Sequence, residues 1–478
     1  MRNNLQKFDN KLEDIKRNLQ NSSDVVVRKL FVKNKNIAII FIDGMIKIDL
    51  LELNVIKPIL TTTKKINLNT LLKNILRVSQ VSKLENQTEL ENSVVKSKIA
   101  IIIDGEQGYL EIGLEGYIQR TPSEPPTSSV IMGPREGFTE DIKTNISLIR
   151  RRLSVSTLKV EQVCVGRKTC TKIDIVYLTH VASCEVVSKI KERLKKVDVD
   201  GIIDSHNIAV ILSAKPNSIF KQVGTSEKPD IITSKLLEGR VAIIVDGSPI
   251  VLTLPFIILE DLQNSNDYYA THHYASFIRV IRCFGLLIAT FLPGAYVSFR
   301  LYHYKIVPLK YLVTIANSTQ NLPFTPFIEM LFILVLFQIL YEVSLRLPRY
   351  LGLATSIVGA LILGDTGVKA GLISPPTVII IAMSLISIYT VSEQTAQLTL
   401  IRFLFIMIGG SVGLLGIIGG GLYLINYLAC FDSYGAPYLA PFAPKIKSDS
   451  KDSLFKKPFT QMKLSPQSFY NKNKVRQK

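Results

Sequence analysis

The run VAIIVDGSPI, residues 241–250, is apolar, rich in β-branched side chains and interrupted by Asp-Gly. Two other runs share this pattern: IAIIFIDGMI at 37–46 and KIAIIIDGEQ at 98–107. A short β-branched run is typical of a buried strand, and Asp-Gly after it favours a tight turn. A looser copy, VDVDGIID, lies at 197–204. The first 270 residues are therefore predicted to contain strands that end at Asp-Gly turns.

Helical patterns separate these strands. The stretch 139–153 offers Thr139 as an N-cap, carries an apolar stripe and ends in three arginines, which suit the negative end of a helix dipole. Residues 183–196 form a second amphipathic, Lys-rich pattern. Alternating strands and helices predict an α/β region with two subdomains, at 31–120 and 130–270, and the Pro- and Ser-rich stretch 121–129 is predicted to link them.

Residues 1–30 are polar and charged, and we expect them to form a charged N-terminal extension. They lack the apolar core of a secretory signal. The N-terminal α/β region is therefore expected to stay in the cytoplasm.

An apolar region begins at Phe277 and is predicted to be an all-α transmembrane domain over 277–430. A membrane span needs about 20 apolar residues. Four segments are long enough, whereas the fifth, Leu351–Leu363, is not. We therefore expect four full spans and one broken or re-entrant segment at 351–371. The four long segments are Phe277–Phe299, Pro326–Val343, Leu372–Val391 and Leu400–Ala429.

The chain has a formal net charge of +18, and residues 444–478 carry ten basic and two acidic side chains. A polybasic segment beside membrane spans favours the cytoplasmic face and contact with anionic membrane lipid. The region 431–478 is therefore predicted to be a basic cytoplasmic tail, and the number of crossings to be even. This membrane setting explains the positive charge better than nucleic-acid binding does, so no nucleic-acid partner is expected.

One polar face is a candidate pore lining. Thr355, Gly359, Ile362 and Thr366 have the spacing i, i+4, i+7 and i+11, which places them on one side of a helix. Asp365 and Lys369 follow at the break. In a ring of identical subunits Ile362 would close a narrow throat, because hydrophobic constrictions gate by dewetting. The alternative is that this face packs against a helix of the same subunit.

The glycines Gly409, Gly413, Gly416 and Gly420 lie in what reads as a continuous apolar helix. They form small-xxx-small pairs, which allow membrane helices to approach closely. A G-x-S-x-G match at 409–413 is rejected, because a nucleophile elbow needs a strand–turn–helix context.

Catalytic and metal signals are weak. Three cysteines, at 164, 170 and 184, lie near His180 and His206, but no C-x-x-C pair exists. No nucleophile–base set or phosphate loop is present either. We therefore predict a protein that is not an enzyme and has no catalytic, metal or cofactor site.

The loop Gly133–Glu140 is shaped by two glycines and a proline ahead of a helix. Its charged pair, Arg135 and Glu136, could bind a partner. The alternative is a structural turn whose arginine pairs internally.

Several blocks carry a family resemblance. The stretch GPREGFTEDIKTNISLIRRRL at 133–153 resembles the signature of the A subunits of spore germinant receptors, the GerA family. So do SEKPDIITSKLLEGRVAIIVDGSPIVLTLP at 226–255, RLPRYLGLATSIVGALILGDTGVKAGLISPP at 346–376 and YGAPYLAPFAP at 434–444. The blocks keep the family's order and cover roughly 30–444. The chain departs from the resemblance at Leu334 and Gln338, where the family commonly carries acidic residues.

The resemblance implies a multi-pass membrane subunit of a nutrient germinant receptor in the inner membrane of a bacterial endospore. It implies a transporter-like B subunit and a lipoprotein C subunit as partners, and a homo-oligomer that forms a nutrient-gated ion channel. It also suggests that Arg135 and Glu136 serve assembly. The alternative function is a secondary transporter with a cytoplasmic regulatory domain. Transporters often repeat their membrane halves, and we find one broken segment without a second copy.

Overall fold

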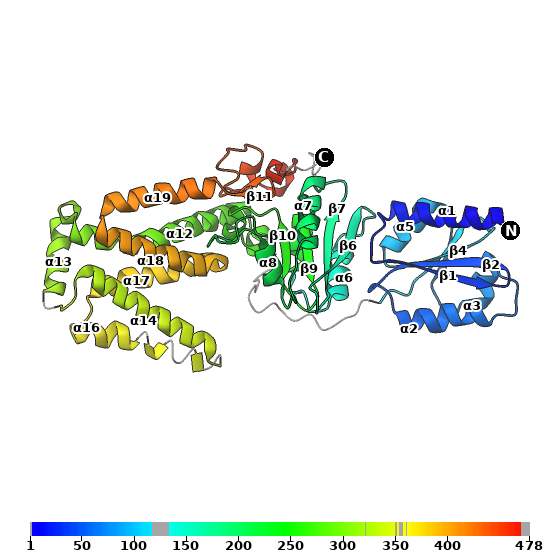
Figure 1. Ribbon diagram of the computed structural model, residues 1–478, viewed down its shortest axis with the longest axis horizontal. Helices are drawn as coiled ribbons and strands as arrows, with labels where there is room; N and C mark the ends of the chain where they lie inside the picture. The colour runs from blue at the N-terminus through cyan, green and yellow to red at the C-terminus, as the bar shows by residue number, and fades with distance from the viewer. Residues whose placement is uncertain are drawn as a thin grey trace.

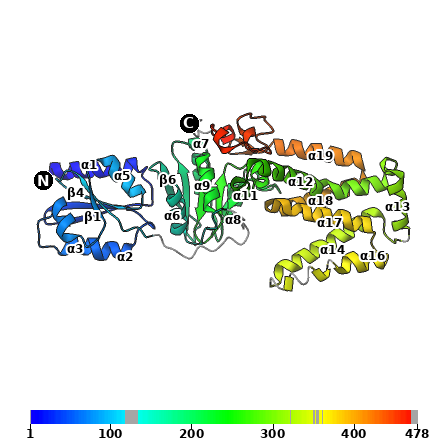
Figure 2. The same ribbon diagram turned by 180° about the vertical axis from the view of Figure 1, so that it is seen from behind.

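A computed structural model describes residues 2–116, 133–320, 322–348, 351–352, 357–359 and 361–469. Two α/β domains and a helical bundle follow one another along the long axis of the molecule (Figure 1). The view from behind shows the same order, with the second α/β domain between the first domain and the bundle (Figure 2). The predicted α/β region followed by a helical domain is confirmed. The linker predicted at 121–129 lies outside the described residues.

The first domain is built on a five-stranded antiparallel sheet in the order β1-β2-β4-β5-β3. Its strands are β1 (Val25–Val32), β2 (Lys35–Ile42), β3 (Val81–Leu84), β4 (Ile99–Ile103) and β5 (Tyr109–Ile112). Helices α1 (Arg2–Asn18) and α5 (Gln87–Val95) cover one face. The other face is covered by α2 (Ile48–Leu51), η1 (Glu52–Ile56), α3 (Lys57–Thr61), α4 (Leu68–Thr70) and η2 (Leu71–Ile75).

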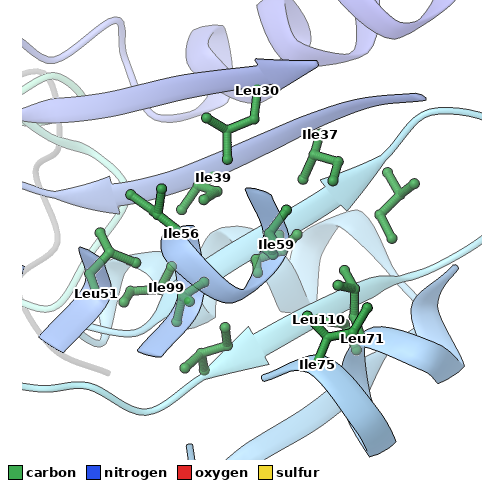
Figure 3. Packing of buried hydrophobic residues seen from close by; sticks show 14 of the residues in the cluster. Leu30, Ile37, Ile39, Leu51, Ile56, Ile59, Leu71, Ile75, Ile99 and Leu110 are labelled. Atoms are coloured by element: carbon green, nitrogen blue, oxygen red, sulfur yellow. The ribbon is translucent and has the colours of Figure 1, made fainter. Parts of the chain in front are cut away.

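Strand β4 shows why these strands read as continuous apolar runs. Ile99, Ile101 and Ile103 point into one helix layer, whereas Ala100 and Ile102 point into the other. A strand alternates its side chains with period two, so burial on both faces requires apolar residues throughout. Figure 3 shows Ile37 and Ile39 of β2 facing Ile56 and Ile59 of the covering helices.

Residues 1–30 do not form the expected extension. They supply helix α1 and most of strand β1, both part of the first domain. Phe8, Leu12, Ile15 and Leu19 are spaced four, three and four residues apart and are buried on the sheet. The polar face of this amphipathic helix dominates its composition and hides the apolar stripe.

The second domain repeats the topology of the first. Its antiparallel sheet has the order β6-β7-β9-β10-β8, which matches the first sheet strand for strand. Helices α6 (Ile142–Arg152) and α9 (Pro229–Leu237) cover one face, and α7 (Cys184–Lys195) and α8 (Ser205–Leu212) cover the other. The strands are β6 (Leu158–Val165), β7 (Thr171–Leu178), β8 (Gly224–Ser226), β9 (Val241–Val245) and β10 (Val251–Leu254).

The repeat extends to backbone detail. Ser97, between α5 and β4, has φ +67°, and Gly239, between α9 and β9, has φ +85°. The aspartates after β4 and β9 donate their backbone N–H groups to equivalent strands: Asp104 to Asn36 at 2.8 Å and Asp246 to Lys172 at 3.0 Å. The recurring Asp-Gly turns therefore mark equivalent places in two copies of one fold.

Helix α6 begins later than the sequence predicted. Its N-cap is Asp141, whose carboxylate accepts the backbone N–H of Thr144 at 2.8 Å, and not Thr139. Thr139 lies before the helix and contacts it through a hydrogen bond, which its backbone N–H donates to Asn145 Oδ1 at 2.8 Å. A carboxylate placed at the N-cap satisfies a free N–H and complements the helix dipole.

Three stretches of the bundle are long and apolar enough to cross a membrane: His272–Leu301, Pro326–Arg346 and Pro375–Ser411. The helices are α12 (His272–Leu301), α13 (Leu309–Thr319), α14 (Pro326–Arg346), α17 (Pro375–Ile388), α18 (Thr395–Ser411) and the shorter α19 (Leu414–Ala429). The run 375–411 folds back at η5 (Tyr389–Gln394), where Val391 leaves helical geometry.

The expected span Leu400–Ala429 is wrong, because Gly413 breaks it with φ +78°. Helix α18 ends at Ser411, and α19 runs back beside it, with Gly420 beside Phe405. The described residues of 351–369 also lie along α14: Gly352 lies beside Ser344, and Gly359 beside Leu340. Among the described residues, the chain therefore reverses direction more often than four spans and a re-entrant segment would require.

The C-terminal region up to Phe469 is not a free tail. Strands β11 (Asp432–Ser433) and β12 (Ala436–Pro437) form a hairpin against the second domain. The hydroxyl of Ser433 accepts the N–H of Phe256 at 3.0 Å, and Tyr438 donates its hydroxyl to the carbonyl of Lys221 at 2.8 Å. The C-terminal region therefore lies on the same side of the bundle as the α/β domains, called the domain side below. The opposite side is called the far end.

Candidate functional site

The candidate pore segment packs against α14 at its glycines. A Cβ on Gly359 would lie 2.7 Å from the Leu340 side chain, and a Cβ on Gly352 would lie 2.7 Å from the carbonyl oxygen of Ser344. Gly359 therefore faces α14 of the same subunit. Thr355 lies outside the described residues.

Ile362–Thr366 forms a π-helical turn, η4, followed by α16 (Gly367–Lys369). A π turn holds more residues than an α turn, so it rotates Thr366 away from the 3.6-residue stripe. The stripe expected from spacing is therefore interrupted. Ile362 is 52% exposed, and Thr366 is exposed as well.

Asp365 and Lys369 form an ion pair of 2.8 Å on the surface of the bundle. Their side chains are 55% and 74% exposed. Charged groups at membrane depth usually face water, a cavity or a protein neighbour. The segment 361–369 therefore presents polar and charged groups on a surface that its own subunit leaves open.

The four packing glycines have different surroundings. A Cβ on Gly409 of α18 would overlap the carbonyl oxygen of Gly294 of α12, so the two backbones meet there. Gly416 and Gly420 of α19 lie against side chains of the preceding helix, including Ile408 and Phe405. Gly413 forms the turn between α18 and α19.

Arg135 and Glu136 have different surroundings in the structure. Glu136 accepts hydrogen bonds from Arg151 and, at 2.7 Å, from Arg152 at the end of α6. Burial raises the pKa of the Glu136 carboxyl, but these arginines outweigh it and hold the pKa below its usual value. Arg135 is exposed. The glutamate therefore serves an internal turn, and the arginine points to the surface.

Two buried ionisable side chains lie inside the bundle. Glu329 of α14 accepts the backbone N–H of Ser374 at 2.6 Å, at the N-terminus of α17, and lies 3.4 Å from Arg300. Arg402 of α18 is 1% exposed, and its one hydrogen bond among the described residues goes to Ser384 Oγ at 3.3 Å. Glu329 is thus compensated, whereas Arg402 keeps an uncompensated guanidinium.

A cluster of charges joins the second domain to the bundle. Lys221 lies 2.7 Å from Glu393 in η5 and 3.4 Å from Asp261. Gln394 donates to Asp261 at 2.6 Å. Lys221 and Glu393 are 172 residues apart, so a local sequence pattern could not pair them.

A second cluster fixes the start of α12. Arg282 donates two hydrogen bonds to Asp267, at 2.7 and 2.8 Å. Burial raises the pKa of the Asp267 carboxyl, but Arg282 and Arg279 outweigh this effect and lower it. Arg279 also binds Asp452 at 2.8 Å, which ties the C-terminal region to α12.

In the described parts of the chain, no group of three or more His, Cys, Asp or Glu side chains could hold a metal ion. The cysteines at 164, 170 and 184 are exposed and unpaired by disulfides. The candidate sites are the polar segment 361–369 and the charged contacts that join the helical bundle to the second α/β domain and the C-terminal region.

Comparison with known proteins identifies the family of this chain. The family described as Bacillus/Clostridium GerA spore germination protein matches residues 13–468. The chain belongs to the GerA family. Its membrane helices and family membership together make it a membrane protein of spore germination.

Several curated GerA-family members from bacilli are similar over most of their length. Spore germination protein KA of Bacillus subtilis (strain 168) is 33% identical over 98% of this chain and 87% of its own. Spore germination protein XA of Bacillus anthracis is 32% identical over 83% of this chain and 81% of its own. A solved structure, the N-terminal domain of the A subunit of the Bacillus megaterium spore germinant receptor GerK3, is 26% identical with TM-score 0.38 over 51% of this chain and 92% of that one.

Proposed function

We propose that this GerA-family chain is the non-enzymatic A subunit of a nutrient germinant receptor and that copies of it form a nutrient-gated ion channel in the spore inner membrane. The proposed partners are a transporter-like B subunit and a lipoprotein C subunit. Both termini would face the cytoplasm, with the basic C-terminal region near anionic lipid.

The observation that carries the channel proposal is the surface of 361–369. An ion pair, a threonine and a π-helical turn lie there on the open side of a segment whose glycines contact α14. Lipid is a poor neighbour for such groups, whereas a water-filled path between subunits suits them. Ile362 lies about one turn from Asp365 and would form the hydrophobic constriction.

The test is potassium efflux from endospores that carry variants of this chain, normalised to the amount of membrane-inserted protein. Ile362→Ala is expected to raise efflux before any nutrient is added. Ile357→Ala is the matched control: Ile357 is 62% exposed on the same segment and lies about 140° around the helix. Ile362→Ala spores that stay quiet at normal abundance would remove Ile362 from the pore.

A further inference from the structure

The turn η5 (Tyr389–Gln394) reverses the chain between α17 and α18 at the domain side of the bundle. Val391 interrupts the helical backbone there with φ −130° and ψ 68°. Ile388 and Val391 are nevertheless buried, packed with Ala289 and Leu398 and against the partly buried Leu262 of the short helix α10 (Leu259–Leu262) in the second domain. The turn is therefore an ordered point of attachment.

Two polar contacts bind this turn to the second domain, and they differ in burial. Gln394 is 3% exposed and donates to Asp261 at 2.6 Å. Glu393 is 49% exposed and meets Lys221 at 2.7 Å and Thr225 at 3.2 Å. Lys221 is 13% exposed and also lies 3.4 Å from Asp261, so it keeps a carboxylate partner when Glu393 moves away. The buried amide contact thus holds the turn, while the half-exposed Glu393 can leave Lys221 without stranding a buried charge.

The position of η5 gives these contacts a mechanical role. Helix α12 and helix α19 are continuous with the α/β domain and the C-terminal hairpin through the chain itself. The hairpin α17–α18 is held at its turn by side chains. The hairpin also packs along α12, where Gly409 meets Gly294 and Ser384 donates to the Ala289 carbonyl at 2.9 Å. A change at η5 therefore alters how movement of the second domain reaches this hairpin.

A continuous set of contacts leads from η5 to the candidate pore segment. Tyr389 of η5 lies against Tyr341 of α14, with ring centroids 6.5 Å apart. The neighbouring Leu340 contacts Gly359 of the segment 351–369. Coupling between distant sites needs a physical contact path of this kind.

We propose that η5 is the joint through which the second α/β domain acts on the channel helices, with Gln394–Asp261 as its anchor and Lys221–Glu393 as its releasable contact. The proposal rests on the channel function proposed above. It assigns Lys221, Thr225 and Glu393 as positioning residues for gating.

The first experiment weakens the releasable contact. In endospores given a medium of amino acids, glucose and inosine, Glu393→Gln is expected to shift the nutrient concentration for half-maximal potassium efflux by about three- to fivefold, the scale of one ion pair with a solvent-exposed carboxylate. Glu342→Gln is the matched control, since Glu342 forms an exposed 2.7 Å pair with Arg346 at the domain side of α14. Equal responses of Glu393→Gln and wild type at equal abundance overturn the proposal.

The second experiment locks the joint reversibly. A Thr225→Cys/Glu393→Cys variant is mildly oxidised, and disulfide formation is checked by electrophoresis. We expect loss of nutrient-triggered efflux after oxidation and its return with dithiothreitol. A Lys168→Cys/Asp200→Cys pair, in place of an exposed ion pair within the second domain, is the control and should respond in both states.

The two proposals fail in different ways. A locked joint that still responds to nutrient overturns the role of η5. A wild-type chain that never raises potassium efflux under any of these conditions removes the channel function itself.

Discussion

Arg150 of α6 binds Asp24 of the first domain through two hydrogen bonds, from Nε to Oδ2 at 2.7 Å and from Nη2 to Oδ1 at 2.9 Å. Ser22 Oγ accepts a third bond from Arg150 at 3.1 Å and is itself bound by the N–H of Val160 at 2.8 Å. Both members of the ion pair are buried. This contact joins the two α/β domains.

Replacing Arg150 by alanine is expected to destabilise the pair of domains by about 3–5 kcal/mol, because it leaves the Asp24 carboxylate buried without its cation. Thermal unfolding of the purified chain measures the loss. The double variant Asp24→Leu/Arg150→Met should recover most of it, since no charge is left buried. Lys168→Ala, at an exposed pair, should change stability by less than about 1 kcal/mol.

Asp174 of β7 makes stability depend on pH. Burial raises the pKa of its carboxyl to about 6, and nearby Asp24 and Asp246 add to the rise. The folded state therefore resists ionisation, so the energetic penalty is present above pH 6 and is relieved as pH falls. Asp174→Asn should stabilise the chain at pH 7.5 by up to about 3 kcal/mol and by roughly half of that at pH 5. A pH-independent difference in unfolding temperature would contradict this prediction.

Gly409 should not tolerate a side chain. The Cβ of Gly409→Ala would overlap the Gly294 carbonyl and push α12 and α18 apart, at an expected cost of about 1–3 kcal/mol. The thermal stability of the detergent-solubilised chain reports this loss. Gly419→Ala is the control, because no atom lies within 4 Å of the Cβ position there. Equal behaviour of the two variants would show that the helices do not meet at Gly409.

The buried Arg402 is expected to lower the free energy of unfolding. Its guanidinium is buried with one hydrogen bond among the described residues, so Arg402→Met should raise the unfolding temperature of the detergent-solubilised chain, by an amount equivalent to about 1–4 kcal/mol. Arg402→Lys keeps the charge and should not. A less stable Arg402→Met variant would indicate that the purified chain compensates this charge.

The two termini are expected to share one side of the membrane, because the C-terminal region up to Phe469 packs against the second α/β domain. Lys447→Cys is exposed on the domain side, and Tyr311→Cys is exposed on α13 at the far end. In intact cells an impermeant thiol reagent should label position 311 and spare position 447. Labelling of 447 alone would invert the proposed orientation.

The local sequence pattern was enough to predict part of this structure. The apolar runs that stop at Asp-Gly are strands β2, β4 and β9, and the Lys-rich stretch 183–196 is α7. Helix α1 was missed although the spacing of its apolar residues is regular, because its charged residues outnumber those apolar residues. The turn at Gly413 was missed because glycine is also common inside membrane helices, so its left-handed backbone leaves no local signal.

Long-range partners were beyond sequence reasoning. Arg150 was assigned to the helix dipole, whereas its partner Asp24 is 126 residues away. The spacing of Gly359, Ile362 and Thr366 assumed a regular helix, and the π turn changes that register. The charge of Glu393 was visible, but its meaning depends on Lys221, which the fold brings to it.

The matching topology of the two α/β domains allows equivalent positions to be compared within one chain. Ser97 and Gly239 occupy the same left-handed position in the two copies. A serine there is strained by about 1–2 kcal/mol relative to glycine. The copy at the free end of the molecule keeps this strain, whereas the copy that carries the membrane bundle has the relaxed residue. The domain at the free end thus holds a residue whose replacement by glycine should relieve strain, whereas the domain next to the bundle already has glycine at that position.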